Sequence, residues 1–459
     1  MGQPAKLTRR ALLEGAAAMG ASSLLGPGAA TAIPGRPSLS SHDVGRLIGG
    51  SGPLRAPRTF ALVGLEWAAP DRPDIELRTR AERGSWSRWV KASVRGHEPD
   101  GAQPAESRFG EPIWTGPADY VQLRSPGSVH GVRLHFVSPP PAAQARAAAF
   151  PMAQPVLAAG PGQPAIIARS AWARGQAPPA VAPHYRTIKL AFVHHSETPN
   201  GYSPGDVPAM LLSIFDYHRY VRQYWDIAYN FAIDGFGRIW EARAGGIDLP
   251  VLGAHAGGYN AESTGAVVLG SFMNVTPPRA AIAALEHLLA WKLSLHGVPT
   301  QGKVTVVVDP ASAFYTPFAP GAHVSLPRVA GHRDGDSTDC PGDAFYARLP
   351  PIRPQITRLA GSPARITLGS SAAKLPAGRP LTLTGRLRRL DGTPLAGAPV
   401  EIQRLSGGAR RTIARGSTGA DGSWSITLEP AHSMLVRALH RPAPATVSDV
   451  VSIEVTRRR

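Results

Sequence analysis

The pattern of residues 166–361 constrains the fold of this 459-residue chain more than any other feature of its sequence. Two short apolar runs, 187–193 and 265–272, have the length and composition of buried strands. Two longer segments, 203–221 and 276–297, repeat apolar residues at helical spacing. Because strands alternate with helices, the sequence predicts a central α/β domain in which helices flank a mixed sheet.

Both helical segments carry recognisable start and stop signals. Ser203 is the expected N-cap of the first helix, with Pro204 in the first helical position and Asp206 completing a pattern like a capping box. Thr276 is the expected N-cap of the second helix, and Gly297 is expected to end it. These residues define the predicted boundaries of the two helices.

Residues 55–138 have a different, all-β pattern, in which short alternating runs are separated by Gly, Pro and Asp turns. Four tryptophans in this segment could form a platform that stacks on sugars, but packing in the core is the commoner role and we favour it. They are Trp67, Trp86, Trp89 and Trp114. We therefore expect an N-terminal β-rich, sandwich-like accessory domain.

The segments that follow suggest a linker, a break and a second β domain. Residues 139–165 are rich in Pro and Ala, which is typical of a linker. A second break is predicted near 350–364. Residues 362–459 again contain short alternating runs with Asp-Gly turn signals, which predict a small C-terminal β-sandwich. The sequence thus predicts a multidomain protein with an all-β domain on each side of the α/β domain.

Residues 1–32 have the features of an export signal. Arg9 and Arg10 precede a weakly apolar stretch, and residues 30–32 (Ala-Thr-Ala) fit a small-x-small cleavage site. We therefore expect export by the twin-arginine pathway and a secreted or cell-wall location. No apolar run in the remaining chain reaches the roughly 18 residues of a membrane-spanning helix, so no span is expected in the mature chain.

The chain is strongly basic, with a formal net charge of +17. A basic exported protein is attracted to polyanions, and anionic cell-wall polymers are the partners that we expect, chiefly for the basic segment 362–459. Nucleic acid is the alternative polyanion. The arginines of this segment are scattered among turns without a recognised pattern of interleaved aromatic residues, so we do not expect nucleic acid as a partner.

Cys340 is the only cysteine in the chain, and it follows His332 in a loop rich in Gly and Asp. A lone cysteine near a histidine indicates either a thiol nucleophile or a metal ligand. A thiol exposed outside the cell is prone to oxidation, whereas zinc would coordinate and protect it. His194, at the end of a predicted strand, completes a candidate set of three ligands, which would leave the fourth position of a tetrahedral zinc ion to water.

Four segments, in this order, resemble those of peptidoglycan recognition proteins and the related zinc-dependent N-acetylmuramoyl-L-alanine amidases. They are FVHHSETPNGY, WDIAYNFAIDGFGRIWEAR, GAHAGGYNAESTGAVVLGSF and GHRDGDSTDCPGDAFYARL. The resemblance covers 166–361, and the flanking β segments resemble accessory regions of secreted actinobacterial members. It implies that the protein binds peptidoglycan and hydrolyses the amide bond between N-acetylmuramic acid and L-alanine of the stem peptide.

The resemblance also implies roles for individual residues. His194, His332 and Cys340 match the ligands of Zn²⁺. Tyr229 matches the catalytic tyrosine, which lies near the metal-bound water and the scissile carbonyl. Thr338 matches a position that is lysine or threonine in active members, and we expect a catalytic role for it.

Other polar residues in these segments have less specific roles. His255, Asn260 and Arg333 are candidates for substrate binding, although turn formation by the first two and simple surface exposure of the arginine are also open. His195 is expected to point away from the metal, because neighbours on a strand face opposite sides. The loop aspartates could orient a histidine, but turn formation is their commoner role. They are Asp334, Asp336 and Asp339.

A non-catalytic peptidoglycan-binding protein is the alternative function. Family members that only bind their ligand typically lack the cysteine among the metal ligands. Because Cys340 is present, the sequence favours catalysis.

Overall fold

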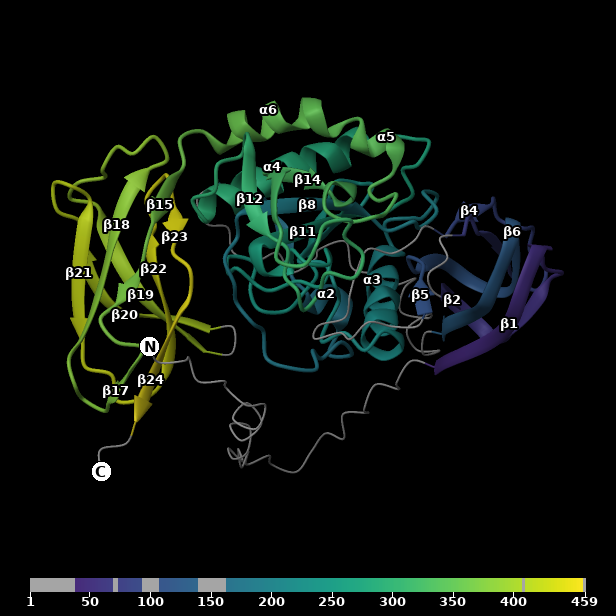
Figure 1. Ribbon diagram of the computed structural model, residues 1–459, viewed down its shortest axis with the longest axis horizontal. Coiled ribbons are helices and arrows are strands. Elements are labelled where there is room, and N and C mark those ends of the chain that lie inside the picture. The colour runs from purple at the N-terminus through teal and green to yellow at the C-terminus, as the bar shows by residue number, and fades with distance from the viewer. Residues whose placement is uncertain (1–37, 69–72, 93–106, 139–161, 407–408, 457–459) are drawn as a thin grey trace, which may run out of the picture. The chain divides into compact units, whose positions relative to one another are not determined.

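The computed structural model describes residues 38–68, 73–92, 107–138, 162–406 and 409–456 (Figure 1). Residues 36–459 belong to one compact unit. The expected export signal, 1–32, lies outside the described residues, as does most of the expected linker, 139–165. Every helix in the described part of the chain is too short or too polar to cross a membrane.

The N-terminal domain contains one six-stranded sheet. Its strands run in the order β4-β3-β6-β2-β5, and β1 pairs with β6. The sheet begins at Ser38, not near residue 55 as expected, because β1 buries little apolar surface and is held mainly by its antiparallel pairing with β6. The strands are β1 (Ser38–Gly50), β2 (Leu54–Ala68), β3 (Glu76–Arg80), β4 (Val90–Lys91), β5 (Ser107–Phe109) and β6 (Ile113–Ser138).

The expected role in the core of this domain is confirmed for Trp67. Trp114 is buried too, but it packs in a cluster shared with helices of the central domain. Trp86 and Trp89 are only half-buried, and the guanidinium group of Arg78 lies over both rings, 4.9 and 4.6 Å from their centroids. The core expectation is wrong for these two, because they follow β3 outside the regular alternation of the strands.

The central domain is built on a six-stranded mixed sheet in the order β14-β8-β11-β9-β10-β7. Strands β14, β8, β11 and β9 are parallel, and β10 runs antiparallel to β9. Helices α4 and α6 pack against one face, while α2 and α3 pack against the other (Figure 1). The strands are β7 (Ile166–Ile167), β8 (Leu190–His195), β9 (Phe231–Ile233), β10 (Ile239–Glu241), β11 (Ser263–Val268) and β14 (Val329–Gly331), with a separate pair, β12 (Lys303–Val307) and β13 (His323–Pro327).

The helices of this domain differ from the expected ones mainly at their N-terminal ends. Ser203 donates hydrogen bonds from its N–H and hydroxyl to the Asp206 carboxylate, but these residues form a turn and the helix begins at Val207. Thr276 does not cap the second helix, because two prolines separate it from the first helical residue. Gly297 follows the end of that helix with a φ of +61°. The helical elements are α2 (Ser170–Ala173), α3 (Val207–Asp216), η2 (Tyr217–Val221), η3 (Asn260–Glu262), α4 (Arg279–Leu295), η4 (His332–Asp334), α5 (Asp343–Tyr346) and α6 (Leu349–Ala360).

Helix α6 corrects the expectation of a break near 350–364. Pro350 and Pro351 occupy its first turn, where a missing N–H breaks no hydrogen bond. Ile352 and Ile356 face the core beside α4. The three prolines within the helix, Pro350, Pro351 and Pro354, therefore obscured an amphipathic helix that covers the sheet.

The C-terminal domain contains two sheets with a shared apolar core. Several contacts attach it to the central domain. Among them, Arg437 pairs with Asp248 at 2.6 Å, Arg410 pairs with the same carboxylate, and Val447 joins the core that contains α4. Although burial opposes it, the charges of Arg437 and Arg410 lower the pKa of Asp248. The strands are β15 (Ala364–Ile366), β16 (Gly369–Ser370), β17 (Lys374–Pro376), β18 (Leu381–Arg389), β19 (Pro399–Ser406), β20 (Ala409–Ser417), β21 (Ser423–Leu428), β22 (Met434–His440), β23 (Thr446–Val447) and β24 (Val451–Thr456).

Candidate metal centre

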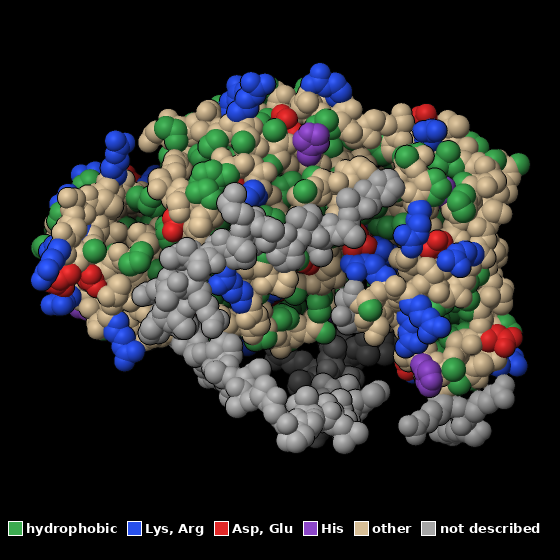
Figure 2. Space-filling view, turned by 180° about the vertical axis from the view of Figure 1, so that it is seen from behind, with side chains coloured by type: hydrophobic (Ala, Val, Ile, Leu, Met, Phe, Trp, Pro, Cys, Tyr) green, Lys and Arg blue, Asp and Glu red, His purple; other side chains and the backbone are tan. Residues whose placement is uncertain are grey.

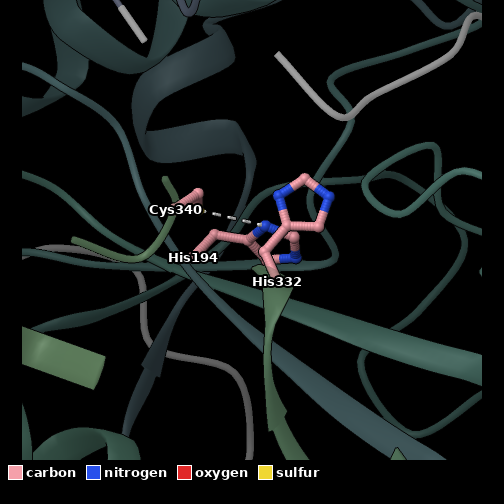
Figure 3. Close-up of side chains that lie close together, drawn as sticks. All are labelled: His194, His332 and Cys340. Atoms are coloured by element: carbon pink, nitrogen blue, oxygen red, sulfur yellow. Dashed lines mark hydrogen bonds between the residues drawn. The ribbon is translucent and has the colours of Figure 1, made fainter. Parts of the chain in front are cut away.

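The three expected ligands meet at one edge of the central sheet (Figure 3). Strands β8 and β14 are parallel neighbours, with Val193 paired to Gly331. The residues that follow this pair, His194 near the end of β8 and His332 just after β14, therefore lie side by side. The loop after His332 then returns Cys340 to the two histidines. The pairing of β8 with β14 and this loop together explain why the three side chains form a cluster.

The geometry of this cluster fits a zinc ion. The ligand atoms of His194, His332 and Cys340 all lie within 4.8 Å of one another, and all three side chains are buried. The distance from Cys340 Sγ to His194 Nδ1 is 3.7 Å. Ordinary Zn–S and Zn–N bonds at a tetrahedral angle place two such atoms about 3.6 Å apart.

A hydrogen bond to His255 orients the first of these histidines. Nε2 of His194 lies 3.2 Å from Nδ1 of His255. Burial lowers the pKa of His255 well below its usual value, which favours a neutral ring whose Nδ1 can accept a hydrogen bond from His194. His194 would then carry its proton on Nε2 and direct the lone pair of Nδ1 toward Cys340 and a metal.

Asp336 orients the second histidine. Its carboxylate lies 3.0 Å from Nε2 of His332, so Nδ1 is the nitrogen that we expect to bind metal. Burial raises the pKa of Asp336. The other two loop aspartates have different contacts: Asp334 accepts a hydrogen bond from Tyr346, and Asp339 pairs with Lys91 of the N-terminal domain.

Cys340 is positioned by the backbone of the neighbouring strand. The N–H of His195 donates to its sulfur at 3.4 Å. Burial, and after it the negative charge of Glu111, raises the pKa of the thiol. The ring of His195 pairs with buried Glu197 at 2.8 Å, away from the ligands. Sequence analysis did not identify Glu197, because nothing in its spacing distinguishes it from a turn residue.

The two expected catalytic residues lie beside the ligands. The ring centroid of Tyr229 is 5.3 Å from that of His194. The Tyr229 hydroxyl donates to Glu111 at 3.4 Å, a contact that sequence analysis also did not identify. The hydroxyl of Thr338 accepts a hydrogen bond from the N–H of Cys340 at 3.2 Å and thereby supports the loop.

The three candidates for substrate binding have structural contacts in this arrangement. His255 is fully buried behind His194. The side-chain oxygen of Asn260 accepts hydrogen bonds from the N–H groups of His255 and Ala256, at 2.8 and 3.0 Å. Arg333 pairs with Asp343 at 2.6 Å. A substrate role for these residues stays a prediction.

We expect the Asp336→Asn variant to bind zinc about 10- to 100-fold more weakly. An uncharged amide is a weaker hydrogen-bond partner for Nε2 of His332 than a carboxylate, so it orients the ring less well. The measurement is zinc affinity by competition with a chromogenic chelator. Asp343→Asn, which changes an exposed carboxylate in the next helix, is the matched control. Equal zinc affinity of both variants and the parent protein would refute the orienting role of Asp336.

Comparisons with known proteins find relatives of the central domain. Residues 184–343 match the family described as N-acetylmuramoyl-L-alanine amidase, and residues 37–154 match one described as Rv3811 N-terminal galactose-binding domain-like. Peptidoglycan-recognition protein LB of Drosophila melanogaster is 28% identical over 186 residues, which are 40% of this chain and 67% of that protein. A peptidoglycan recognition protein of Trichoplusia ni is 30% identical over 184 residues, which are 40% of this chain and 85% of that protein. The solved structure of wild-type Drosophila PGRP-LB aligns with 40% of this chain and 91% of its own, at 27% identity and a TM-score of 0.31.

These sequence matches define the class of the protein. The chain belongs to the family of peptidoglycan recognition proteins and type 2 N-acetylmuramoyl-L-alanine amidases. The match of residues 37–154 also agrees with a β-rich N-terminal domain that begins before residue 55.

Proposed function

We propose that this protein is a zinc-dependent peptidoglycan hydrolase that cleaves the amide bond between N-acetylmuramic acid and L-alanine. The observation that carries the proposal is the convergence of His194, His332 and Cys340 within 4.8 Å. Two nitrogens and one sulfur form a donor set suited to zinc, and three protein ligands are the number found in catalytic sites.

The roles of the surrounding residues follow from their positions. Zinc, when bound, supplies a Lewis acid that activates water and polarises a carbonyl near neutral pH. The hydroxyl of Tyr229 can donate a hydrogen bond to the carbonyl oxygen of the substrate as negative charge develops on it. Thr338 holds the backbone of Cys340 in place through its hydroxyl and faces a pocket open to solvent.

The test is digestion of purified peptidoglycan by the zinc-loaded protein, with identification of products by mass spectrometry. The amidase is expected to release intact stem peptides with a free L-alanine amine. Reducing ends from glycan cleavage, or shortened stem peptides, would indicate a different bond specificity. If the protein binds peptidoglycan but releases no product, the result would instead support the alternative of a peptidoglycan-binding protein.

We also propose that the C-terminal domain binds anionic cell-wall polymers. Figure 2 shows Lys and Arg side chains distributed over one face of the molecule, with fewer Asp and Glu among them. In the C-terminal domain, Arg404 and Arg411 lie directly opposite each other on β19 and β20, and both are exposed. Two adjacent positive charges on a sheet surface attract polyanions in a salt-dependent manner.

The double variant Arg404→Glu/Arg411→Glu is expected to bind purified cell walls at least about threefold more weakly at low ionic strength, with little difference in high salt, where exposed charges are screened. A pull-down with walls across a salt series is the measurement. Arg55→Glu, which changes an exposed arginine of the N-terminal domain, is the control. Unchanged binding of the double variant would contradict the proposed role of this surface.

A further inference from the structure

Glu111 comes from the N-terminal domain but lies in the candidate metal centre. It sits between β5 and β6, far in sequence from the ligands. The side chain is 1% exposed, and its carboxylate accepts the hydrogen bond from Tyr229. The charge of Glu111 also acts on the Cys340 thiol. A buried carboxylate of an accessory domain therefore contacts a candidate catalytic group of another domain.

Contacts around Glu111 hold the N-terminal domain over the site. The guanidinium group of Arg222 lies 3.4 Å from the ring centroid of Phe109, two residues before Glu111. Lys91 pairs with Asp339, the neighbour of Cys340, at 2.9 Å. Farther away, Gly64 of β2 packs so closely against the helical segment after α3 that an added Cβ would overlap the Tyr217 ring. The N-terminal and central domains therefore touch at several separate points around Glu111, and not at this residue alone.

The metal centre beside this interface is closed to solvent. His194, His332 and Cys340 are 0% exposed, and Tyr229 is 1% exposed. A pocket of about 440 Å³ remains next to them, lined by residues of both domains that include Thr338 and Lys91. A stem peptide attached to a glycan strand cannot bring its amide to atoms that solvent does not reach.

We propose that the N-terminal domain is autoinhibitory and that Glu111 blocks the catalytic centre until the domain moves away. This inference rests on the proposed amidase function. Glu111 accepts the hydrogen bond that Tyr229 would donate to the substrate carbonyl, so the two compete for one donor.

A catalytic role for Glu111 is the competing interpretation, and the burial of the site argues against it. Substrate reaches the ligands only when the N-terminal domain separates from this edge of the sheet. Glu111 moves with that domain, so it is absent from the centre when the substrate is present. The two interpretations predict opposite effects of removing the carboxylate.

The first test uses the only cysteine as a probe of closure. Metal-free, full-length protein is treated with Ellman's reagent, which reacts with Cys340 only when the interface opens. Lys91→Glu is expected to react about tenfold faster, which corresponds to about 1.4 kcal/mol of lost interface stability. Glu111→Gln is expected to react at least as fast, because it weakens the interface and also removes a negative charge that raises the pKa of the thiol. Glu66→Gln is the matched control, because it changes a partly buried glutamate of the same domain that pairs with His135, away from the centre. Unchanged reactivity of both variants would overturn the proposal.

The second test measures hydrolysis of peptidoglycan by the same zinc-loaded proteins. Both variants are expected to have initial rates several-fold above the parent and the Glu66→Gln control. A loss of activity in Glu111→Gln without faster thiol labelling would overturn autoinhibition and indicate catalysis by the carboxylate. If thiol labelling is faster but no variant hydrolyses peptidoglycan, the proposed closure by the interface stands. Only the proposed amidase function is then contradicted.

Discussion

Replacement of Cys340 by serine is expected to remove zinc and activity together. The serine hydroxyl stays protonated near neutral pH, whereas the thiolate is a soft, charged ligand that zinc prefers. Loss of a direct ligand exceeds the 10- to 100-fold effect of losing an orienting residue, so we expect at least about a 100-fold decrease in zinc affinity. Zinc content after gel filtration and the initial rate of peptidoglycan hydrolysis are the two measurements.

The control for this variant must separate loss of metal from loss of fold. Ser337→Ala lies in the same loop and changes a hydroxyl that is not among the expected ligands, so it is expected to keep its zinc. Circular dichroism of Cys340→Ser should match that of the parent, because the core of the central domain does not depend on the thiol. Full zinc content in the serine variant would refute the ligand assignment.

Replacement of Tyr229 by phenylalanine is expected to lower kcat by about 10²- to 10³-fold while zinc content is unchanged. Removal of one hydrogen-bond donor to a developing oxyanion has an effect of this size. The variant also loses the hydrogen bond to Glu111, which should open the site. The opening is expected to raise the rate only several-fold, so the loss of the donor dominates.

The combination of measurements distinguishes these two effects. Thiol labelling of metal-free Tyr229→Phe should be faster than that of the parent, while hydrolysis by the zinc-loaded variant is much slower. Tyr224→Phe is the matched control, because it changes a buried tyrosine that stacks on His218 beside Tyr229. A Tyr229→Phe variant with parental kcat would remove the tyrosine from the proposed mechanism.

The metal centre could be predicted from sequence because its signals are local. His194 and His332 each follow a short apolar run, and parallel pairing of β8 with β14 places such residues together. The order of the four similar segments supplied the rest. The role of Asp336 was harder to predict, because an aspartate in a loop has the same local pattern whether it orients a histidine or forms a turn.

The features that sequence could not predict depend on tertiary contacts. Glu111 has no motif around it, and only the docking of one domain on another brings its carboxylate to Tyr229. Helix α6 replaces the expected break, because Pro350 and Pro351 lie in its first turn, where proline is tolerated, and the apolar packing of Ile352 and Ile356 holds the helix despite Pro354 in its interior. Strand β1 was missed because pairing with β6, and not its own alternation, holds it in place.

The attachment of the C-terminal domain through Asp248 has a consequence for how the proposed amidase would act on the cell wall. A catalytic domain on a flexible tether samples a sphere around its anchor, whereas Arg410 and Arg437 fix the distance between the proposed polymer-binding face and the metal centre. The rigidly attached C-terminal domain would then keep the metal centre at a constant distance from the polymer to which the protein is bound. Cuts are expected at a nearly constant spacing from each anchored polymer, so density of anchoring sites, more than enzyme concentration, would determine the pattern of cleavage.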